Sequence, residues 1–235
     1  VHYTAGGSVE SAVQTFRNTS SMASAHVVIG RKGEVIQMVP FDTVAWHAGK
    51  SQYGNRTGLN RYSIGIEIDN AGLLEKRGDK YFSWFNREYP ESEVVYAVHR
   101  NEFTPRYWHA YTDVQIERVM EISYLQKSNF PVSLILGHEE ISPVRKIDPG
   151  PAFPLDKIRS RVLCSGRNED GEEIKLQEMT VTAQWLNIRE LPDINSEKVA
   201  KPLAKNHKVR TIERKNGWVK VSTAVTGWVT ERYLK

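Results

Sequence analysis

The residues best suited to chemistry lie in one short polar stretch, from Leu136 to Pro151. His138 is followed ten positions later by Asp148, and Lys146 stands two positions before that aspartate. Three prolines and two glycines in the stretch argue against a regular helix, so we expect a stiffened loop. Histidine and carboxylate side chains are both good zinc ligands. The stretch therefore predicts either part of a zinc site or a structural ion pair beside a helix N-cap.

A zinc site here needs another protein ligand from elsewhere in the chain, because catalytic zinc usually takes three protein ligands and a water. The other six histidines are candidates, and spacing alone does not choose among His2, His26 and His47. The helical zincin motif is excluded, since the residue four positions after the histidine of the stretch is Ser142. From spacing, the identity of the third ligand stays open.

The elements that must position these groups can be read from hydrophobic periodicity. The apolar run 132–136 predicts a buried strand leading into the polar stretch, and 62–68 is apolar enough to predict a central strand that carries Glu67. Residues 24–39 predict a hairpin around Gly30 to Gly33. Residues 71–111 are rich in aromatics without a clean period, and core packing is a better interpretation for them than a sugar-binding platform. Helices are predicted over residues 8–19, 92–101, 112–127 and 155–162.

A polar segment, residues 165–178, predicts a linker between a domain at 1–164 and a smaller one at 179–235. Beyond it, turn residues separate short strands at close spacing, which is typical of a small barrel. The expected strands are 180–183, 186–189, 208–212, 218–222 and 227–229. The interval from Trp218 to Trp228 suits a hairpin that places two indoles on the barrel.

Charge is unevenly distributed along the chain, whose formal net charge is +4. Residues 180–235 contain eleven Lys or Arg and five Asp or Glu, a net +6, which leaves −2 for the rest. This asymmetry indicates an anionic partner for the C-terminal part, either nucleic acid or an anionic cell wall, or else a merely solvated basic face.

No apolar run is long enough to span a membrane. The single cysteine, Cys164, excludes an internal disulfide and is expected in the core. Val1 begins abruptly in a strand-like segment, as in a processed or trimmed chain.

Five segments carry a resemblance to a known family. They are His2-Tyr3-Thr4-Ala5, Ser24-Ala25-His26, Ala45-Trp46-His47-Ala48-Gly49, Ser63-Ile64-Gly65-Ile66-Glu67, and Gly137-His138 with Lys146-Ile147-Asp148-Pro149-Gly150-Pro151-Ala152-Phe153. In this order they resemble the zinc-dependent N-acetylmuramoyl-L-alanine amidases of the type 2 family, the AmpD-like relatives of peptidoglycan recognition proteins. The resemblance covers roughly residues 1–163. It implies a mixed α/β fold with a central sheet of about five or six strands flanked by helices.

The resemblance also implies roles for individual residues. Zinc would be bound by His2, His138 and Asp148, leaving a fourth position open for water and the substrate carbonyl. Glu67 and Lys146 would be the catalytic pair, the first as proton carrier and the second as stabiliser of the oxyanion. The alternatives are a satisfied half-buried carboxylate for the glutamate and a surface ion pair with the aspartate for the lysine.

Three further residues of the shared segments lie in or near the cleft of the family. His26 and His47 would hydrogen-bond ligands or substrate, or else be core histidines with backbone partners. Trp46 would line the cleft or simply pack. We therefore carry all three forward as candidate substrate-binding residues.

The C-terminal residues resemble bacterial SH3-like domains through Leu186-Asn187-Ile188-Arg189, Gly217-Trp218-Val219-Lys220-Val221 and Gly227-Trp228-Val229. This implies a module that binds the cell wall, with a structural appendage as the alternative, and favours the cell envelope or secretion over the cytoplasm.

The expected activity is hydrolysis of the bond between N-acetylmuramic acid and L-alanine in peptidoglycan or muropeptides. A non-catalytic peptidoglycan receptor is the alternative. A nucleic-acid binder rests on charge alone, without a stacking stripe or groove helix.

Overall fold

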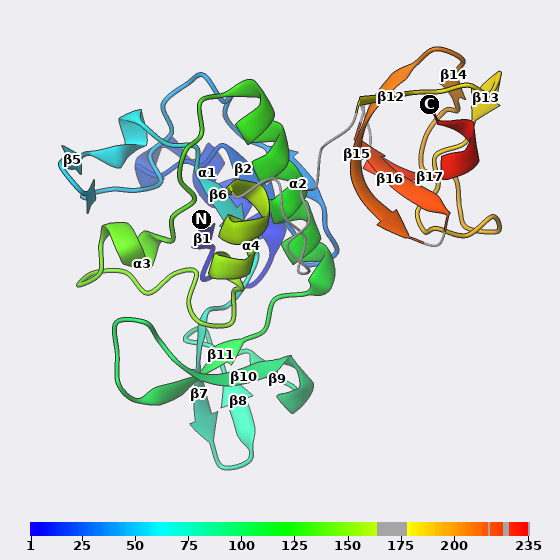
Figure 1. The fold of residues 1–235 in the computed structure, drawn as a ribbon. Helices are drawn as coiled ribbons and strands as arrows, with labels where there is room; N and C mark the ends of the chain where they lie inside the picture. Colours follow the sequence, from blue (N-terminus) through cyan, green and yellow to red (C-terminus); the bar gives the residue numbers. More distant parts are fainter. Residues whose placement is uncertain (164–177, 216, 223–225, 235) are drawn as a thin grey trace. The chain divides into compact units, whose positions relative to one another are not determined.

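The structure, a computed structural model, describes residues 1–163, 178–215, 217–222 and 226–234. The chain divides into two compact units, Val1–Cys164 and Ser165–Lys235 (Figure 1). Cys164, predicted to lie in the core, and residues 165–177, predicted to form a linker, are outside the described residues. No helix in the described part of the chain is both long and apolar enough to cross a membrane.

The N-terminal unit is built on a four-stranded mixed sheet with the order β1-β6-β2-β3. β1 (His2–Tyr3) and β2 (Val27–Ile29) flank β6 (Ile66–Ile68) in parallel, and β3 (Val35–Gln37) is antiparallel to β2. All three residues of β6 are buried, which confirms the prediction of a central strand. The predicted hairpin is likewise confirmed by β2 and β3. The sheet has four strands, fewer than the five or six expected.

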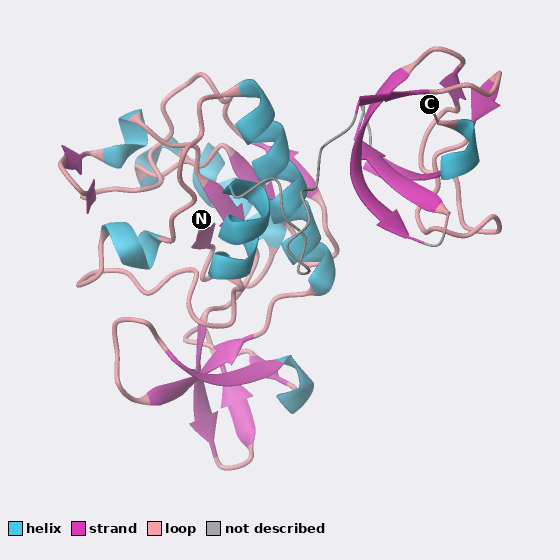
Figure 2. Cartoon of the chain, viewed as in Figure 1, coloured by secondary structure: helices cyan, strands magenta, loops and turns pink. Residues whose placement is uncertain are grey.

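Helices cover both faces of this sheet (Figure 2). On one face, α1 (Val9–Arg17) packs against Val28, and the hydroxyl of Ser8 caps its first turn. On the other face, α2 (Asp113–Asn129) and α4 (Leu155–Leu163) pack against the remaining core-facing residues of β2 and β6. Because successive side chains of a strand point to opposite faces of the sheet, the same strands contact helices on both faces. The helices predicted at 8–19, 112–127 and 155–162 are confirmed, and α2 begins at the predicted cap with a capping box.

The aromatic-rich residues form a second, antiparallel sheet with the order β10-β11-β7-β8-β9. Its strands are β7 (Leu73–Arg77), β8 (Lys80–Phe82), β9 (Glu88–Tyr89), β10 (Val94–Val98) and β11 (Pro105–His109). Buried aromatic residues provide a small core of its own, as was expected for this region.

The helix predicted over residues 92–101 is wrong. A 3-10 turn, Glu91–Glu93, leads directly into the strand β10. β-branched residues dominate the run that follows, and such residues favour a strand. Pairing with β11 along the whole of β10 satisfies the backbone groups on one edge of this strand and holds it extended.

The strand predicted over residues 132–136 is also wrong. This segment is extended but unassigned, and only Ile135 within it is buried. Val1 bonds to the end of this segment and just beyond it: its nitrogen donates to the Leu136 carbonyl (2.7 Å), and its carbonyl accepts from His138 N (3.2 Å). Because β1 has only two residues, too little edge remains for a fifth strand. A single helical turn, α3 (His138–Ile141), follows where no regular helix was expected.

The remaining short elements of this unit lie in its loops. They are β4 (Gln52–Tyr53), β5 (Arg56–Thr57), and the 3-10 turns at Thr19–Ser21 and Leu59–Arg61.

The C-terminal unit is all-β in its described part, apart from the 3-10 turn Glu231–Tyr233. Its strands are β12 (Glu178–Thr180), β13 (Trp185–Leu186), β14 (Leu203–Ala204), β15 (Lys208–Lys215), β16 (Trp218–Ser222) and β17 (Thr226–Thr230). They form a sheet in the order β12-β15-β16-β17 and the separate pair β13-β14 around an apolar core. The predicted hairpin is present as β16 and β17, with Lys220 opposite Trp228; the Trp228 side chain is outside the described residues.

Candidate metal centre and cleft

The paired strands β1 and β6 place His2 and Glu67 side by side. The two residues are register partners in this parallel pair. Tyr3 on β1, and Ile66 and Ile68 on β6, pack into the core beneath α2 and α4. Alternation along each strand therefore turns His2 and Glu67 together to the opposite face.

The loop after α2 brings the other two candidate ligands to this face. His138 opens the single turn α3 beside Val1, and Glu139 N donates to the Asp148 carbonyl (2.8 Å). The structure thus brings His2 next to His138 and Asp148, and this choice was the one that spacing had left open.

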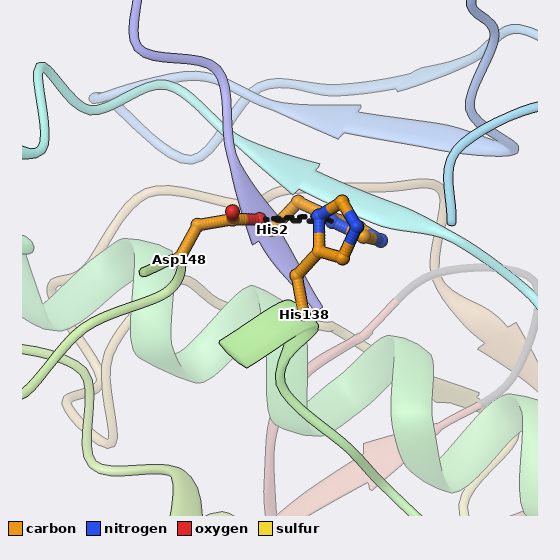
Figure 3. Close-up of side chains that lie close together, drawn as sticks. All are labelled: His2, His138 and Asp148. Carbon is orange, nitrogen blue, oxygen red and sulfur yellow. Dashed lines mark hydrogen bonds and ion pairs between the residues drawn. The ribbon is translucent and has the colours of Figure 1, made fainter. Parts of the chain in front are cut away.

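Three side-chain atoms of these residues converge at one point (Figure 3). His2 Nδ1 lies 2.9 Å from His138 Nδ1 and 3.0 Å from Asp148 Oδ2. His138 Nδ1 lies 3.0 Å from the same carboxylate oxygen. All three residues are buried, with 2%, 4% and 6% of their surface exposed.

Hydrogen bonds behind His2 assign its tautomer. Ser63 Oγ donates to the Leu59 carbonyl (2.7 Å), so it can only accept from His47 Nε2 (3.2 Å). His47 Nδ1 is then an acceptor, and it receives the proton of His2 Nε2 (3.0 Å). Burial lowers the pKa of His2 to about 3 and that of His47 to about 2, which keeps both rings neutral at pH 7. His2 therefore presents an unprotonated Nδ1.

The tautomer of His138 follows more directly. Its Nε2 lies 3.1 Å from the carbonyl oxygen of Ala48, which can only accept, and 3.4 Å from Arg145 Nη2. That Nη2 already donates its two protons to the Ala48 and Lys50 carbonyls, so His138 Nε2 carries the ring proton. In this tautomer Nδ1 has a free lone pair, like that of His2. Outer partners that fix the tautomer in this way are typical of metal-binding histidines.

The donor set fits a cation such as zinc. Two unprotonated imidazole nitrogens and a carboxylate oxygen approach within 3.0 Å of one another, and the assigned tautomers leave no proton between them. Such an arrangement of lone pairs is repulsive unless a positive charge lies among them. Ligand atoms bonded to tetrahedral zinc at about 2.0–2.1 Å would be about 3.3 Å apart, close to the spacing found.

Glu67 and Lys146 line the same cleft of about 440 Å³ as His138 and Asp148. Glu67 is 8% exposed, and its Oε2 has no hydrogen-bond partner within the described part of the chain. Burial, and then repulsion from Asp148, raise the pKa of Glu67 well above its ordinary value. Lys146 is half-buried, and among the described residues it forms no ion pair with Asp148. The glutamate is therefore not the satisfied carboxylate considered as its alternative.

The three candidate substrate-binding residues occupy different places. His26 is 1% exposed; its Nδ1 accepts from Gly65 N (2.9 Å) and its Nε2 donates to the Thr43 carbonyl (2.9 Å). These are the bonds of a structural histidine, which was the alternative for it. His47 and Trp46 both line the cleft; His47 also hydrogen-bonds to His2, and Trp46 is half exposed.

Sequence reasoning did not single out two parts of the cleft. Arg145 lines it and donates to the carbonyls of Ala48 (3.2 Å) and Lys50 (3.1 Å), and its position beside Lys146 was the only local signal for it. The opposite wall is formed by the Thr4 to Gly6 turn and by α1, which was predicted as a helix but not as part of the site.

Comparison with known proteins matches both units. The sequence profile of the N-acetylmuramoyl-L-alanine amidase family matches residues 1–151, and that of the bacterial SH3 domain matches residues 186–235. The 1,6-anhydro-N-acetylmuramyl-L-alanine amidase AmpD of Salmonella typhimurium strain SL1344 is 33% identical over 148 residues, which are 62% of this chain and 60% of the relative.

A second relative has a solved structure. The N-acetylmuramoyl-L-alanine amidase AmiD of Escherichia coli K12 is 30% identical over 165 residues, 67% of this chain and 50% of the relative. Its structure with the substrate anhydro-N-acetylmuramic acid-L-Ala-D-γ-Glu-L-Lys matches with a TM-score of 0.50 and 26% identity, covering 67% of this chain and 53% of that one. The chain thus spans between half and three fifths of the length of these relatives.

Proposed function

The chain belongs to the N-acetylmuramoyl-L-alanine amidase family, and from this premise we propose that it is a zinc-dependent hydrolase. Its reaction would be cleavage of the amide bond between the lactyl group of N-acetylmuramic acid and L-alanine, in peptidoglycan or in muropeptides. The named activities and the muropeptide complex of its relatives support this substrate class.

The observation that carries the proposal is the convergence of His2 Nδ1, His138 Nδ1 and Asp148 Oδ2 without a proton between them. These three residues would hold one zinc ion. When bound there, zinc supplies Lewis-acid activation of the amide carbonyl and of water. Ala48 and His47 fix the two rings from behind, so their lone pairs remain directed at the ion.

Glu67 would move the proton in this reaction. Its Oε2 would take a proton from the attacking water and return it to the departing amine of L-alanine. Burial raises the pKa of this carboxyl, which favours its holding a proton between the two transfers, and the lack of a hydrogen-bond partner among the described residues leaves that oxygen available.

Lys146 would stabilise the negative charge that develops on the carbonyl oxygen of the scissile amide. It stands on the same loop as Asp148 and lines the cleft with Glu67. A fixed ammonium group in a cleft that is partly closed to water stabilises such a charge more strongly than it would in bulk water. Trp46, half exposed at the same cleft, would contact the substrate.

We further propose that the C-terminal unit attaches the enzyme to the anionic cell wall, which would place its action in the cell envelope. The net +6 of residues 180–235 supports the electrostatic part. Trp185 is 64% exposed on this unit, and the apolar side chains of Leu191 and Ile194 are also exposed. These side chains supply apolar surface for contact with the wall. A chain ending at residue 178 should bind sacculi far less than the full chain while cleaving soluble muropeptides equally well. Equal binding of both chains to sacculi would refute this role.

The activity is tested by incubating the purified protein with intact sacculi and with soluble muropeptides, each with and without a chelator. New amino termini of L-alanine that vanish with the chelator are the expected result, and the preferred material defines the substrate size. Binding of either material without new termini, by protein that contains one equivalent of zinc, would instead identify a peptidoglycan receptor.

A further inference from the structure

Glu139 connects the two loop segments that carry His138 and Asp148. It follows His138 directly, and its backbone nitrogen donates to the carbonyl of Asp148 (2.8 Å). Its side-chain Oε2 accepts from Gly150 N (3.0 Å), two residues beyond that aspartate. The residue is 2% exposed. One buried residue therefore ties the two loop segments together, through its backbone nitrogen and through its side chain.

The second sheet holds Glu139 in turn. In the loop between β10 and β11, His99 Nε2 lies 2.7 Å from Glu139 Oε2, and Arg100 Nε lies 3.0 Å from Oε1. Asn101 Nδ2 donates to the Glu139 carbonyl (3.0 Å). Both carboxylate oxygens and the carbonyl of this residue are thus occupied by three consecutive residues of another sheet.

The geometry of His99 is itself fixed. Its Nδ1 accepts from Asn101 N (3.2 Å), so the ring proton is on Nε2 and is donated to Glu139. The ring stacks on Trp108, with centroids 5.6 Å apart and planes at 24°. The same indole lies close to Gly150, where an added Cβ would be 3.0 Å from it. The histidine and the loop beyond Asp148 therefore pack on one indole.

We propose that His99, supported by Arg100 and Asn101, is a positioning residue for the metal site. It holds Glu139, which keeps His138 and Asp148 at the separation that one ion requires. This inference rests on the proposed function, since it presupposes that these residues bind zinc. It assigns the second sheet a role beyond its own folding, namely as a brace for the loop-borne ligands.

The test compares His99→Leu with His99→Gln in the full chain. Leucine removes the donor to Glu139, whereas the glutamine amide can still donate to it. Zinc affinity is measured by competition with a chromophoric chelator, and ligand geometry by the visible absorption of the cobalt-substituted protein. His99→Leu should bind zinc about tenfold to a hundredfold more weakly and shift the cobalt bands. His99→Gln should restore most of the affinity and the wild-type bands.

A matched variant separates positioning from stability. Tyr81→Leu damages the core of the same sheet without touching the metal loop, so it should lower the melting temperature but leave zinc affinity and the cobalt spectrum unchanged. If His99→Leu does not fold, Asn101→Ala removes a single bond to Glu139 and should weaken zinc binding several-fold. Wild-type affinity in the folded histidine variant, or in Asn101→Ala if it replaces that variant, would overturn the inference. Failure of the wild-type protein itself to bind zinc would overturn both this inference and the proposed function.

Discussion

The candidate site is assembled from two halves that are held in different ways. His2 and Glu67 stand on adjacent strands of the central sheet, where backbone hydrogen bonds between β1 and β6 set their register. His138 and Asp148 stand on an irregular segment, which backbone and side-chain groups from distant parts of the chain hold in place. To bring His2 and Glu67 together, the chain needs only to pair these two strands in this register, with side chains that alternate between the two faces of the sheet. The second half depends on particular distant residues.

The loop half shows how many such contacts are required. Besides the bonds of Glu139, the Tyr111 hydroxyl donates to the Pro149 carbonyl (2.7 Å), and Arg145 ties the loop to the carbonyls of Ala48 and Lys50. Each of these contacts joins residues at least 38 positions apart in sequence. A substitution far from the candidate site can therefore move His138 and Asp148. His2 and Glu67, in contrast, are held by the backbone hydrogen bonds of the sheet.

The largest effect should come from removing the anionic ligand of the loop half. Asp148→Asn leaves two neutral nitrogens, so zinc affinity should fall by more than the ten- to hundredfold that loss of an outer partner costs, and activity should vanish. Zinc content after dialysis against a weak chelator measures this. Asp79→Asn, in the exposed turn between β7 and β8, is the control. Affinity within tenfold of wild type would exclude Asp148 as a ligand.

Glu67→Gln tests the strand half without touching a ligand. The amide cannot carry the proton, so kcat should fall by about 10²–10⁴ while one equivalent of zinc stays bound. Steady-state kinetics with a soluble muropeptide, together with metal analysis, measure both quantities. Glu75→Gln, on the exposed part of β7, should change neither. Wild-type turnover in the Glu67 variant would remove this residue from the mechanism.

Acid should destabilise the metal-free protein through the strand half. Burial lowers the pKa of His2 from 6.5 to about 3, so between these values the unfolded chain binds a proton that the folded chain does not. The free energy of unfolding should therefore fall as pH falls, by about 3 kcal/mol between pH 7 and pH 4 from this residue. Urea unfolding of chelator-treated protein measures it. His2→Asn should show a shallower pH dependence, and equal slopes would contradict the assignment.

The smallest effect should come from the support behind His2. His47→Leu removes the acceptor for the His2 Nε2 proton, so the tautomer is no longer fixed and zinc affinity should fall about tenfold to a hundredfold. His26→Gln is the matched control, because that histidine bonds only to backbone groups and should affect stability alone. Titration with zinc and a competing chelator distinguishes the two. Equal losses of affinity would show that His47 acts only through the fold.

The same division explains what could be predicted from sequence. β6 and α2 follow from local patterns, an apolar run and a capping box, and both lie close to where they were expected. The loop ligands His138 and Asp148 also stood out locally, in one polar stretch, but spacing could not select His2 of the strand half as their partner, and only the family resemblance did so. The strand β10 was mistaken for a helix because its pairing with β11 is a tertiary contact that the local pattern does not contain.

One glycine shows how far the metal site extends beyond its ligands. An added Cβ at Gly65 would lie 2.3 Å from the ring of His47. The imidazole that orients His2 thus occupies the volume that a side chain at position 65 would fill. Even alanine there would displace this ring. The hydrogen bond from His2 Nε2, which fixes the tautomer of that candidate ligand, would then be lost. The absence of a side chain at position 65 is therefore a requirement of the candidate metal site, because it leaves the volume that the His47 ring occupies.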